Sequence, residues 1–394
     1  MKPRLFLAPF AFSLFQFSAA LAQQAQPVPA SVISLKLQPF IDQHTIAGAV
    51  LLVATKDKVL TCEAVGYSDL NAKKAMNTDQ LFEIASMSKP IATTALMMLV
   101  EDGKVNIDDP VSKYLPEFSN QMYIAEKDAN HILLKKPGHP LLVRNLLSHT
   151  GGLLYSGPLE TPTLDGLPLK TVIAEHAMLP LQFEPGTQFL YSNAGMGTLA
   201  RIVEVVSGMP YEKYLDERLF KPLGMKDTTF WPDEEQLKRL AKCYKANASK
   251  TALEETPLDA RFSFPLNDTV HRHAMPGIGL FSTASDMLKF CQMYLNGGVY
   301  DGKRYLSEAT VAMMTTKQTP EGIKNKYGFG WSADAPGKYS HGGSFNTCMT
   351  IDSGLGLITI YLTQHTGPMV KGGEKAKPAF ETAAKTLAPT AAKE

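Results

Sequence analysis

Residues 84–103 read IASMSKPIATTALMMLVEDG and combine a chemical motif with the start of a long helix. The apolar residues between 91 and 100 recur at helical spacing, and Gly103 suits a C-terminal helix cap. Proline is tolerated near a helix start but not in its interior, so Pro90 indicates that the helix begins close to it. The Ser-x-x-Lys quartet of Ser86 and Lys89 is therefore expected at the entrance of this helix.

Ser86 and Lys89 are separated by about one helical turn, so their side chains are expected on the same face. A serine hydroxyl is a poor nucleophile until an adjacent base removes its proton. A lysine acts as that base only where burial or neighbouring cations lower its pKa. Ser88 faces another direction and is the weaker candidate. The motif alone decides little, because about one Ser-x-x-Lys is expected by chance in a chain of this length.

A second motif is Tyr191-Ser192-Asn193, which lies between a turn and a predicted helix. A tyrosine held between two ammonium groups can act as a phenolate-like base. The Asn193 amide can hold a substrate amide or orient a lysine. Taken alone, a core tyrosine and a helix-capping asparagine explain the same residues.

A third motif is His341-Gly342-Gly343-Ser344, which follows one predicted strand and precedes another. The two glycines would let a substrate backbone approach the strand closely. An N–H near Ser344 would then join the N–H of Ser86 in stabilising an oxyanion. The competing interpretation is a plain hairpin turn with a surface histidine.

The ordered set of three motifs resembles the serine β-lactamase and penicillin-binding-protein superfamily. The particular forms are similar to class C β-lactamases, β-lactamase-like esterases, D-specific peptidases and D-aminopeptidases. Three further stretches agree with the resemblance, and it extends over about residues 35–365. These stretches are Leu146–Leu153, Pro222–Met225 and Gly279–Asp286.

The resemblance implies a role for each motif residue. Ser86 would be acylated, Lys89 and Tyr191 would share the general-base and general-acid work, and Asn193 would support them. His341 occupies the position where lactamases and transpeptidases usually have the lysine of a Lys-Thr-Gly motif. A neutral histidine, with a reference pKa of about 6.5, offers a hydrogen bond in place of a permanent cation. Strong recognition of penicillin-like carboxylates is therefore not expected.

Histidines outside the third motif have other expected roles. His149 lies in a Gly-rich loop and is expected to organise that loop. His271 and His273 do not form a recognisable ligand pattern, so no metal site is predicted. The sequence indicates no cofactor.

The predicted secondary structure is α+β. A helix over 32–44, which Pro39 should kink or interrupt, precedes a hairpin over 47–67. Short strands return over 328–362, followed by a terminal helix over 374–388. The sequence thus predicts one antiparallel sheet built from both chain ends, flanked by helices, with an inserted helical lobe.

This prediction divides residues 23–394 into two lobes of a single catalytic unit. An α/β lobe takes about residues 30–85 and 290–390, and the helical lobe about 105–290. Residues 240–276 have weak periodicity and are expected to be irregular.

Residues 1–22 are expected to be an export signal. Lys2 and Arg4 precede an apolar run that ends in Ala20-Leu21-Ala22, a small-x-small cleavage pattern. No later segment is long and apolar enough to span a bilayer. The protein is therefore expected to be secreted or periplasmic, without a stable membrane span after signal removal.

Composition excludes several further classes of protein. The net charge is +1, from 39 basic and 38 acidic residues, so a nucleic-acid partner is not indicated. The four cysteines form no CxxC pair and are expected to be free buried thiols. There is no GxSxG elbow, which disfavours an α/β-hydrolase. The sequence does not define an oligomeric state.

The leading interpretation is an exported serine hydrolase that forms an acyl-enzyme on Ser86. Its partners would be small esters or amides, with possible weak action on β-lactams. A D,D-peptidase or D-aminopeptidase and an acyltransferase are alternatives within the same chemistry. A catalytically silent binding protein on the same fold is the alternative of another class, and the intact Ser86, Lys89, Tyr191 and Asn193 argue against it.

Overall fold

The fold is built on a seven-stranded antiparallel sheet made from both ends of the chain, in a computed structural model that describes residues 31–258 and 262–389. The predicted export signal, residues 1–22, lies outside the described part. The strand order is β12-β13-β14-β15-β1-β2-β3. The strands are β1 (Gly48–Ala54), β2 (Val59–Asp69), β3 (Lys74–Ala75), β12 (Ser332–Ala335), β13 (Lys338–Gly342), β14 (Cys348–Asp352) and β15 (Leu357–Leu362). Because β1 pairs with both β2 and β15, the predicted α+β class with a sheet from both chain ends is confirmed.

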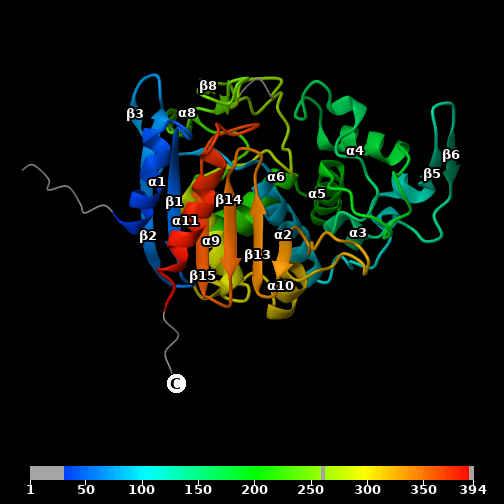
Figure 1. The fold of residues 1–394 in the computed structure, drawn as a ribbon. Coiled ribbons are helices and arrows are strands. Elements are labelled where there is room, and N and C mark those ends of the chain that lie inside the picture. Colours follow the sequence, from blue (N-terminus) through cyan, green and yellow to red (C-terminus); the bar gives the residue numbers. More distant parts are fainter. Residues whose placement is uncertain (1–30, 259–261, 390–394) are drawn as a thin grey trace, which may run out of the picture.

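Strand β1 is buried along its whole length because both faces of the sheet are covered. Successive side chains point to opposite faces of a strand. Leu51 and Val53 pack with helices α1 (Val32–Asp42) and α11 (Ala376–Lys385), whereas Val50 and Leu52 belong to the main core on the other side. Figure 1 shows α1 and α11 lying side by side in front of the sheet.

The expectation that Pro39 interrupts the first helix is wrong, because α1 continues to Asp42. A proline removes the N–H that would bond to the carbonyl four residues earlier, here that of Leu35. Both Pro39 and Leu35 lie on the exposed side of α1. Water can therefore hydrogen-bond to the carbonyl that loses its partner.

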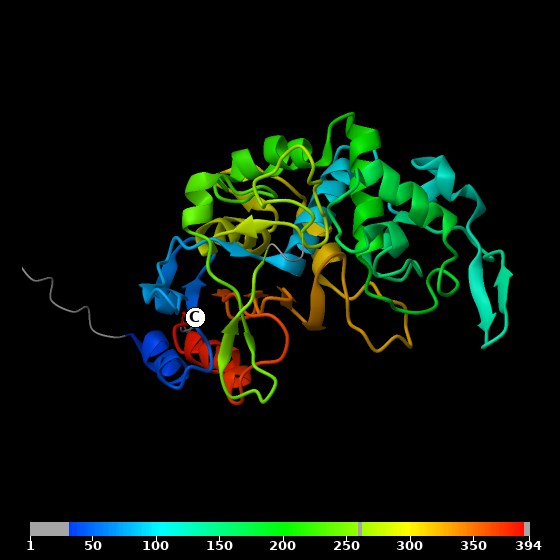
Figure 2. The same ribbon diagram turned by 90° about the horizontal axis from the view of Figure 1, so that it is seen from above.

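The opposite face of the sheet is covered by α9 (Ala284–Leu295), which packs on β1, β14 and β15. Helix α2 (Ser88–Glu101) lies next and packs against α5 (Asn193–Ser207) in the helical part of the molecule. Figures 1 and 2 show this helical part beside the sheet, with α2 between the two. The remaining helices are α3 (Val143–Leu147), α4 (Leu169–Met178), α6 (Tyr211–Leu215), α7 (Lys221–Leu223), α8 (Glu234–Lys238) and α10 (Glu308–Thr315).

Four small two-stranded ladders supplement the main sheet. They are β4 (Phe82–Glu83) with β9 (Phe281–Ser282), β5 (Tyr123–Lys127) with β6 (Ile132–Lys135), β7 (Tyr244–Ala246) with β8 (Leu253–Glu255), and β10 (Val299–Tyr300) with β11 (Lys303–Arg304). The prediction of an irregular segment over 240–276 is therefore wrong for β7 and β8. Tyr244 exchanges backbone hydrogen bonds with Gln364 and Thr366, distant partners that local periodicity cannot reveal.

The strand predicted over 328–332 forms later, as β12, because residues 327–331 make a buried turn. Gly330 has a φ of +84°, a left-handed conformation that favours glycine. A Cβ at this position would overlap the side chain of Thr93 in α2. This close approach fixes the turn against the helix that carries Lys89.

Replacing Gly330 with alanine should therefore destabilise the protein more than an ordinary left-handed glycine would. Gly208 is the matched control, because its φ is +72° and a Cβ there would meet no atom within 4 Å. Gly208→Ala should cost about 1–2 kcal/mol of unfolding free energy from the backbone conformation alone. Gly330→Ala should add about 1–3 kcal/mol of overpacking. Urea unfolding of both variants measures the difference, and equal losses would contradict the packing argument.

Candidate active site

Ser86 lies in a single 3-10 turn, η1 (Ala85–Met87), that runs directly into α2. It is the one residue between positions 81 and 99 that is not buried. Ala85 before it has a φ of +45°, a left-handed conformation that an alanine adopts at a cost of about 1–2 kcal/mol. Such strain is typical of functional turns, and here it precedes the accessible hydroxyl.

Ser88, the weaker sequence candidate, has no exposed surface. Its hydroxyl donates to the Ala85 carbonyl at 2.6 Å and accepts the N–H of Leu280 at 3.3 Å. Ser88 therefore anchors the start of α2, and Ser86 remains the accessible hydroxyl of the motif.

Lys89 is completely buried, and its ammonium nitrogen has three partners. Nζ lies 3.1 Å from Ser86 Oγ, 2.7 Å from Asn193 Oδ1 and 2.8 Å from the Gly277 carbonyl oxygen. Burial holds the pKa of Lys89 well below its usual value of 10.5, since a charged amine loses its hydration there.

The three partners of Lys89 determine what its neutral form does. The Asn193 Oδ1 and the Gly277 carbonyl can only accept hydrogen bonds, so each takes one N–H. A neutral amine has two N–H groups and one lone pair. With both N–H groups donated to these two acceptors, the lone pair faces Ser86 Oγ. The lone pair is thus directed at the hydroxyl proton that a base must remove.

Gly277 is a part of the site that the sequence analysis did not identify. Its contribution is a backbone carbonyl, which no side-chain motif reveals. A Cβ on Gly277 would lie 2.7 Å from Asn193 Oδ1 and 3.4 Å from Lys89 Nζ. Glycine is therefore required for the chain to approach this closely.

Tyr191 lies against the same pair, with Lys89 Nζ 4.4 Å from the centre of its ring. Burial raises the pKa of the Tyr191 hydroxyl, and its hydrogen bond with Ser86 offsets only part of this rise. Among the described residues, Lys89 supplies the ammonium group that contacts the Tyr191 ring, and the neutral His341 lies on its other side. The raised pKa favours a neutral phenol for Tyr191 in the free protein.

His341, on β13, is a buried side chain and not a surface histidine. Its Nδ1 lies 2.8 Å from the Gly342 carbonyl, which can only accept, so Nδ1 carries the proton. Nε2 then accepts the Tyr327 hydroxyl at 3.0 Å. Burial and the nearby Lys89 charge lower the pKa of His341 to about 3. His341 is therefore neutral, and both of its ring nitrogens are engaged within the protein.

Gly342 ends β13, and Gly343 and Ser344 begin the turn that leads to β14. Gly343 donates its N–H to the Thr347 carbonyl at 2.8 Å, and a Cβ on it would overlap Thr347 Oγ1 and the Ile84 carbonyl. The missing side chain of Gly343 thus allows the backbone of Ile84, two residues before Ser86, to approach closely. This contact between Gly343 and Ile84 brings the His341–Ser344 motif next to the Ser86–Lys89 motif. Ser344 is exposed beside it.

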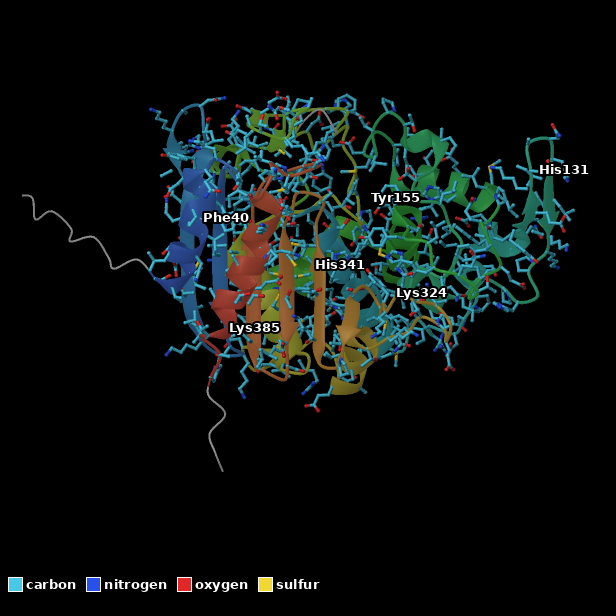
Figure 3. All side chains as sticks on the ribbon, viewed as in Figure 1. Phe40, His131, Tyr155, Lys324, His341 and Lys385 are labelled. Carbon is cyan, nitrogen blue, oxygen red and sulfur yellow. The ribbon has the colours of Figure 1, made fainter. Side chains whose placement is uncertain are left out.

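An aromatic group surrounds the catalytic side chains and was also missed by the sequence analysis. The His149 ring centre lies 4.6 Å from that of Tyr191, 5.0 Å from that of Tyr327 and 5.9 Å from that of Phe189. Tyr155, near Tyr191, is half exposed. Figure 3 shows Tyr155 and His341 along the boundary between the sheet and the helical part.

The described part of the chain contains no cluster of three or more His, Cys, Asp or Glu side chains able to hold a metal ion. The four cysteines form no disulfide bond within the described part of the chain. Cys243, Cys291 and Cys348 are buried, as expected, whereas Cys62 is partly exposed. None of the described helices is both long and apolar enough to cross a membrane.

The beta-lactamase family model matches residues 33–384, nearly the whole described chain. This chain belongs to the beta-lactamase family. Protein Rv1367c of Mycobacterium tuberculosis (strain ATCC 25618 / H37Rv) is 31% identical over 358 residues, covering 82% of this chain and 87% of that protein. A protein of Escherichia coli (strain K12) named "Putative D-alanyl-D-alanine carboxypeptidase" is 28% identical. The match covers 70% of this chain and 67% of that protein.

Solved structures agree with this beta-lactamase-family assignment. EstCE1, described as a hydrolase with promiscuous acyltransferase activity, is 26% identical with a TM-score of 0.74 and covers 90% of this chain and 97% of its own. Simvastatin synthase (LovD) of Aspergillus terreus is 21% identical with a TM-score of 0.74, and the match covers 91% of this chain and 98% of its own. At this identity it supports the fold alone. The resemblance to the serine β-lactamase and penicillin-binding-protein superfamily is confirmed.

The position of Lys89 predicts its effect on the pH dependence of this beta-lactamase-family protein. A protonated ammonium cannot take the Ser86 proton, so kcat/KM for a neutral ester should rise with pH through the Lys89 pKa, well below 10.5. His341 should add no second ionisation between about pH 5 and 8, because its pKa is about 3.

A Lys89→Arg variant separates proton transfer from charge, because arginine keeps the cation but stays protonated. The variant should lose about 10³-fold in kcat/KM, as should Lys89→Met, with circular dichroism confirming that both fold. If Lys89→Arg kept its activity while Lys89→Met lost it, Lys89 would act as a charge and not as a base.

Proposed function

We propose that the protein is an acyl-enzyme hydrolase that uses Ser86 to cleave small uncharged esters or amides. The observation that carries the proposal is the completely buried Lys89, whose Nζ lies 3.1 Å from Ser86 Oγ and is fixed from behind by Asn193 and Gly277. A purely structural lysine would gain nothing from a partly exposed serine as its third partner.

In the proposed reaction, neutral Lys89 removes the Ser86 proton as Oγ attacks the carbonyl carbon of the substrate. The N–H of Ser86, at the start of a helical turn, and an N–H near Ser344 would stabilise the oxyanion. The bond to the leaving group then breaks, and that group takes up the proton held by Lys89, with Tyr191 as the relay. Water attacks the acyl-enzyme in the second half and regenerates Ser86.

The uncharged surroundings of the site support the choice of substrate. Lysine in the position of His341 would offer a cation to a substrate carboxylate, but His341 is neutral and both of its nitrogens are engaged. Burying a carboxylate without a cation is costly. The alternatives of a D,D-peptidase and of an efficient β-lactamase, whose substrates carry a carboxylate, are therefore less favoured.

An acyltransferase remains the second candidate, because an alcohol or amine can replace water in the deacylation step. The relative EstCE1, at 26% identity, is described as having promiscuous acyltransferase activity. We also propose that the working enzyme is exported after removal of residues 1–22, as the sequence indicates. A catalytically silent binding protein is disfavoured, because the side chains of Ser86, Lys89 and Tyr191 are assembled.

Incubation with a fluorophosphonate should place one covalent adduct on Ser86, because the probe reacts with serines activated by an adjacent base. Intact-mass and peptide mass spectrometry detect the adduct. Ser86→Ala should abolish it. Ser88→Ala is the matched control and should keep the adduct, since Ser88 is buried. Labelling that persists in Ser86→Ala would contradict the nucleophile assignment.

A substrate panel tests the preference for uncharged compounds. Short-chain p-nitrophenyl esters should be cleaved with a kcat/KM at least about 10-fold above that for nitrocefin or a D-alanyl-D-alanine peptide, in line with a missing cation worth about 1.4 kcal/mol or more. D-amino-acid amides and an added alcohol acceptor complete the panel. Faster turnover of the carboxylate-bearing substrates would show that the neutral site does not set the specificity.

A further inference from the structure

His149 occupies a left-handed backbone position, which glycine adopts most easily. It follows α3, with a φ of +57°. Its N–H bonds to the Leu146 carbonyl and the N–H of Thr150 bonds to the Asn145 carbonyl, which together form a Schellman motif. Glycine or asparagine is the usual residue at this left-handed position. The backbone therefore does not explain a histidine here, and its ring must be considered.

The ring and the backbone of His149 accept hydrogen bonds from the N–H groups of Leu190 and Ser192, the residues before and after Tyr191. The His149 carbonyl accepts the N–H of Leu190 at 2.9 Å. Nδ1 of the ring accepts the N–H of Ser192 at 3.2 Å. The ring also packs on Tyr191, with 4.6 Å between their centres. His149 thus contacts the Tyr191 ring and hydrogen-bonds to both of its neighbours in the chain.

The hydrogen bond to Ser192 fixes the chemical state of His149. Nδ1 accepts, so the proton of the neutral ring lies on Nε2, which has no partner among the described residues and lies within the aromatic group. If Nδ1 were protonated, it would become a donor facing the N–H of Ser192, and the hydrogen bond would be lost. Burial, with smaller effects from Lys89 and His341, lowers the pKa of His149 well below its usual value, which keeps the acceptor available.

We propose that His149 is a positioning residue that sets the place of the Tyr191 hydroxyl relative to Ser86. This inference rests on the proposed function, because it assigns His149 a role only through Tyr191. His149 touches neither Ser86 nor Lys89 by a hydrogen bond in the described part of the chain. A displacement of about 1 Å in a catalytic group can cost about 10²-fold in rate, so the loss of this clamp should be visible in acylation.

Two variants separate the clamp from simple packing. His149→Phe keeps an aromatic ring against Tyr191 but has no acceptor for Ser192. His149→Asn tolerates the left-handed backbone and places Oδ1 near the position of Nδ1. His149→Phe should slow fluorophosphonate labelling of Ser86 by about 10²-fold, and His149→Asn should recover most of that loss. Thermal unfolding checks that both variants fold.

The decisive measurement is a double-mutant cycle with Tyr191→Phe. Since His149 acts through the Tyr191 hydroxyl, His149→Phe should slow labelling less than about twofold further once that hydroxyl is gone. The same loss of about 10²-fold in both backgrounds would overturn the inference, as would a His149→Phe variant that labels as fast as the wild type. A wild type that is not labelled at all would overturn the proposed function itself, and this inference with it.

Discussion

Lys89 has no exposed surface, and the roles of the groups around it depend on that burial. A buried amine must either lose its charge or find acceptors for all of its protons. The structure provides two fixed acceptors, the Asn193 side chain and the Gly277 carbonyl, and leaves the third direction to Ser86. The lysine can therefore change its protonation state without moving, and under the proposed function the proton that it exchanges belongs to Ser86.

The aromatic and imidazole groups around Lys89 are neutral, which follows from the same burial. The pKa of Tyr191 is raised, and the pKa values of His149 and His341 are lowered. The charged form of Lys89 is thus surrounded by dipoles and rings among the described residues that contact it. Under the proposed function, such a site would stabilise negative charge that develops on a substrate during reaction better than it would hold a substrate that already carries a carboxylate.

The parts of the site that the sequence predicted are those set by short-range geometry. Ser86 and Lys89 share a helical face, so their contact follows from spacing alone, and a run of β-favouring apolar residues identified β1. The parts it missed depend on the complete fold. The Gly277 carbonyl carries no side-chain signature, and the neutral state of Tyr191 depends on its burial. The engaged nitrogens of His341 depend on Tyr327, whose position follows from the turn that Gly330 allows.

The sheet has a consequence for the order of folding. Strand β1 can pair early with β2, its neighbour in the chain, but its other edge must wait for β15. The Thr363 hydroxyl donates to the Gly48 carbonyl across a separation of 315 residues. Contacts this remote form late and slowly, because a long loop must close first. The β13–β14 turn that touches Ile84 arrives at a similarly late stage. The surroundings of Ser86 are therefore complete only after the two ends of the chain have come together.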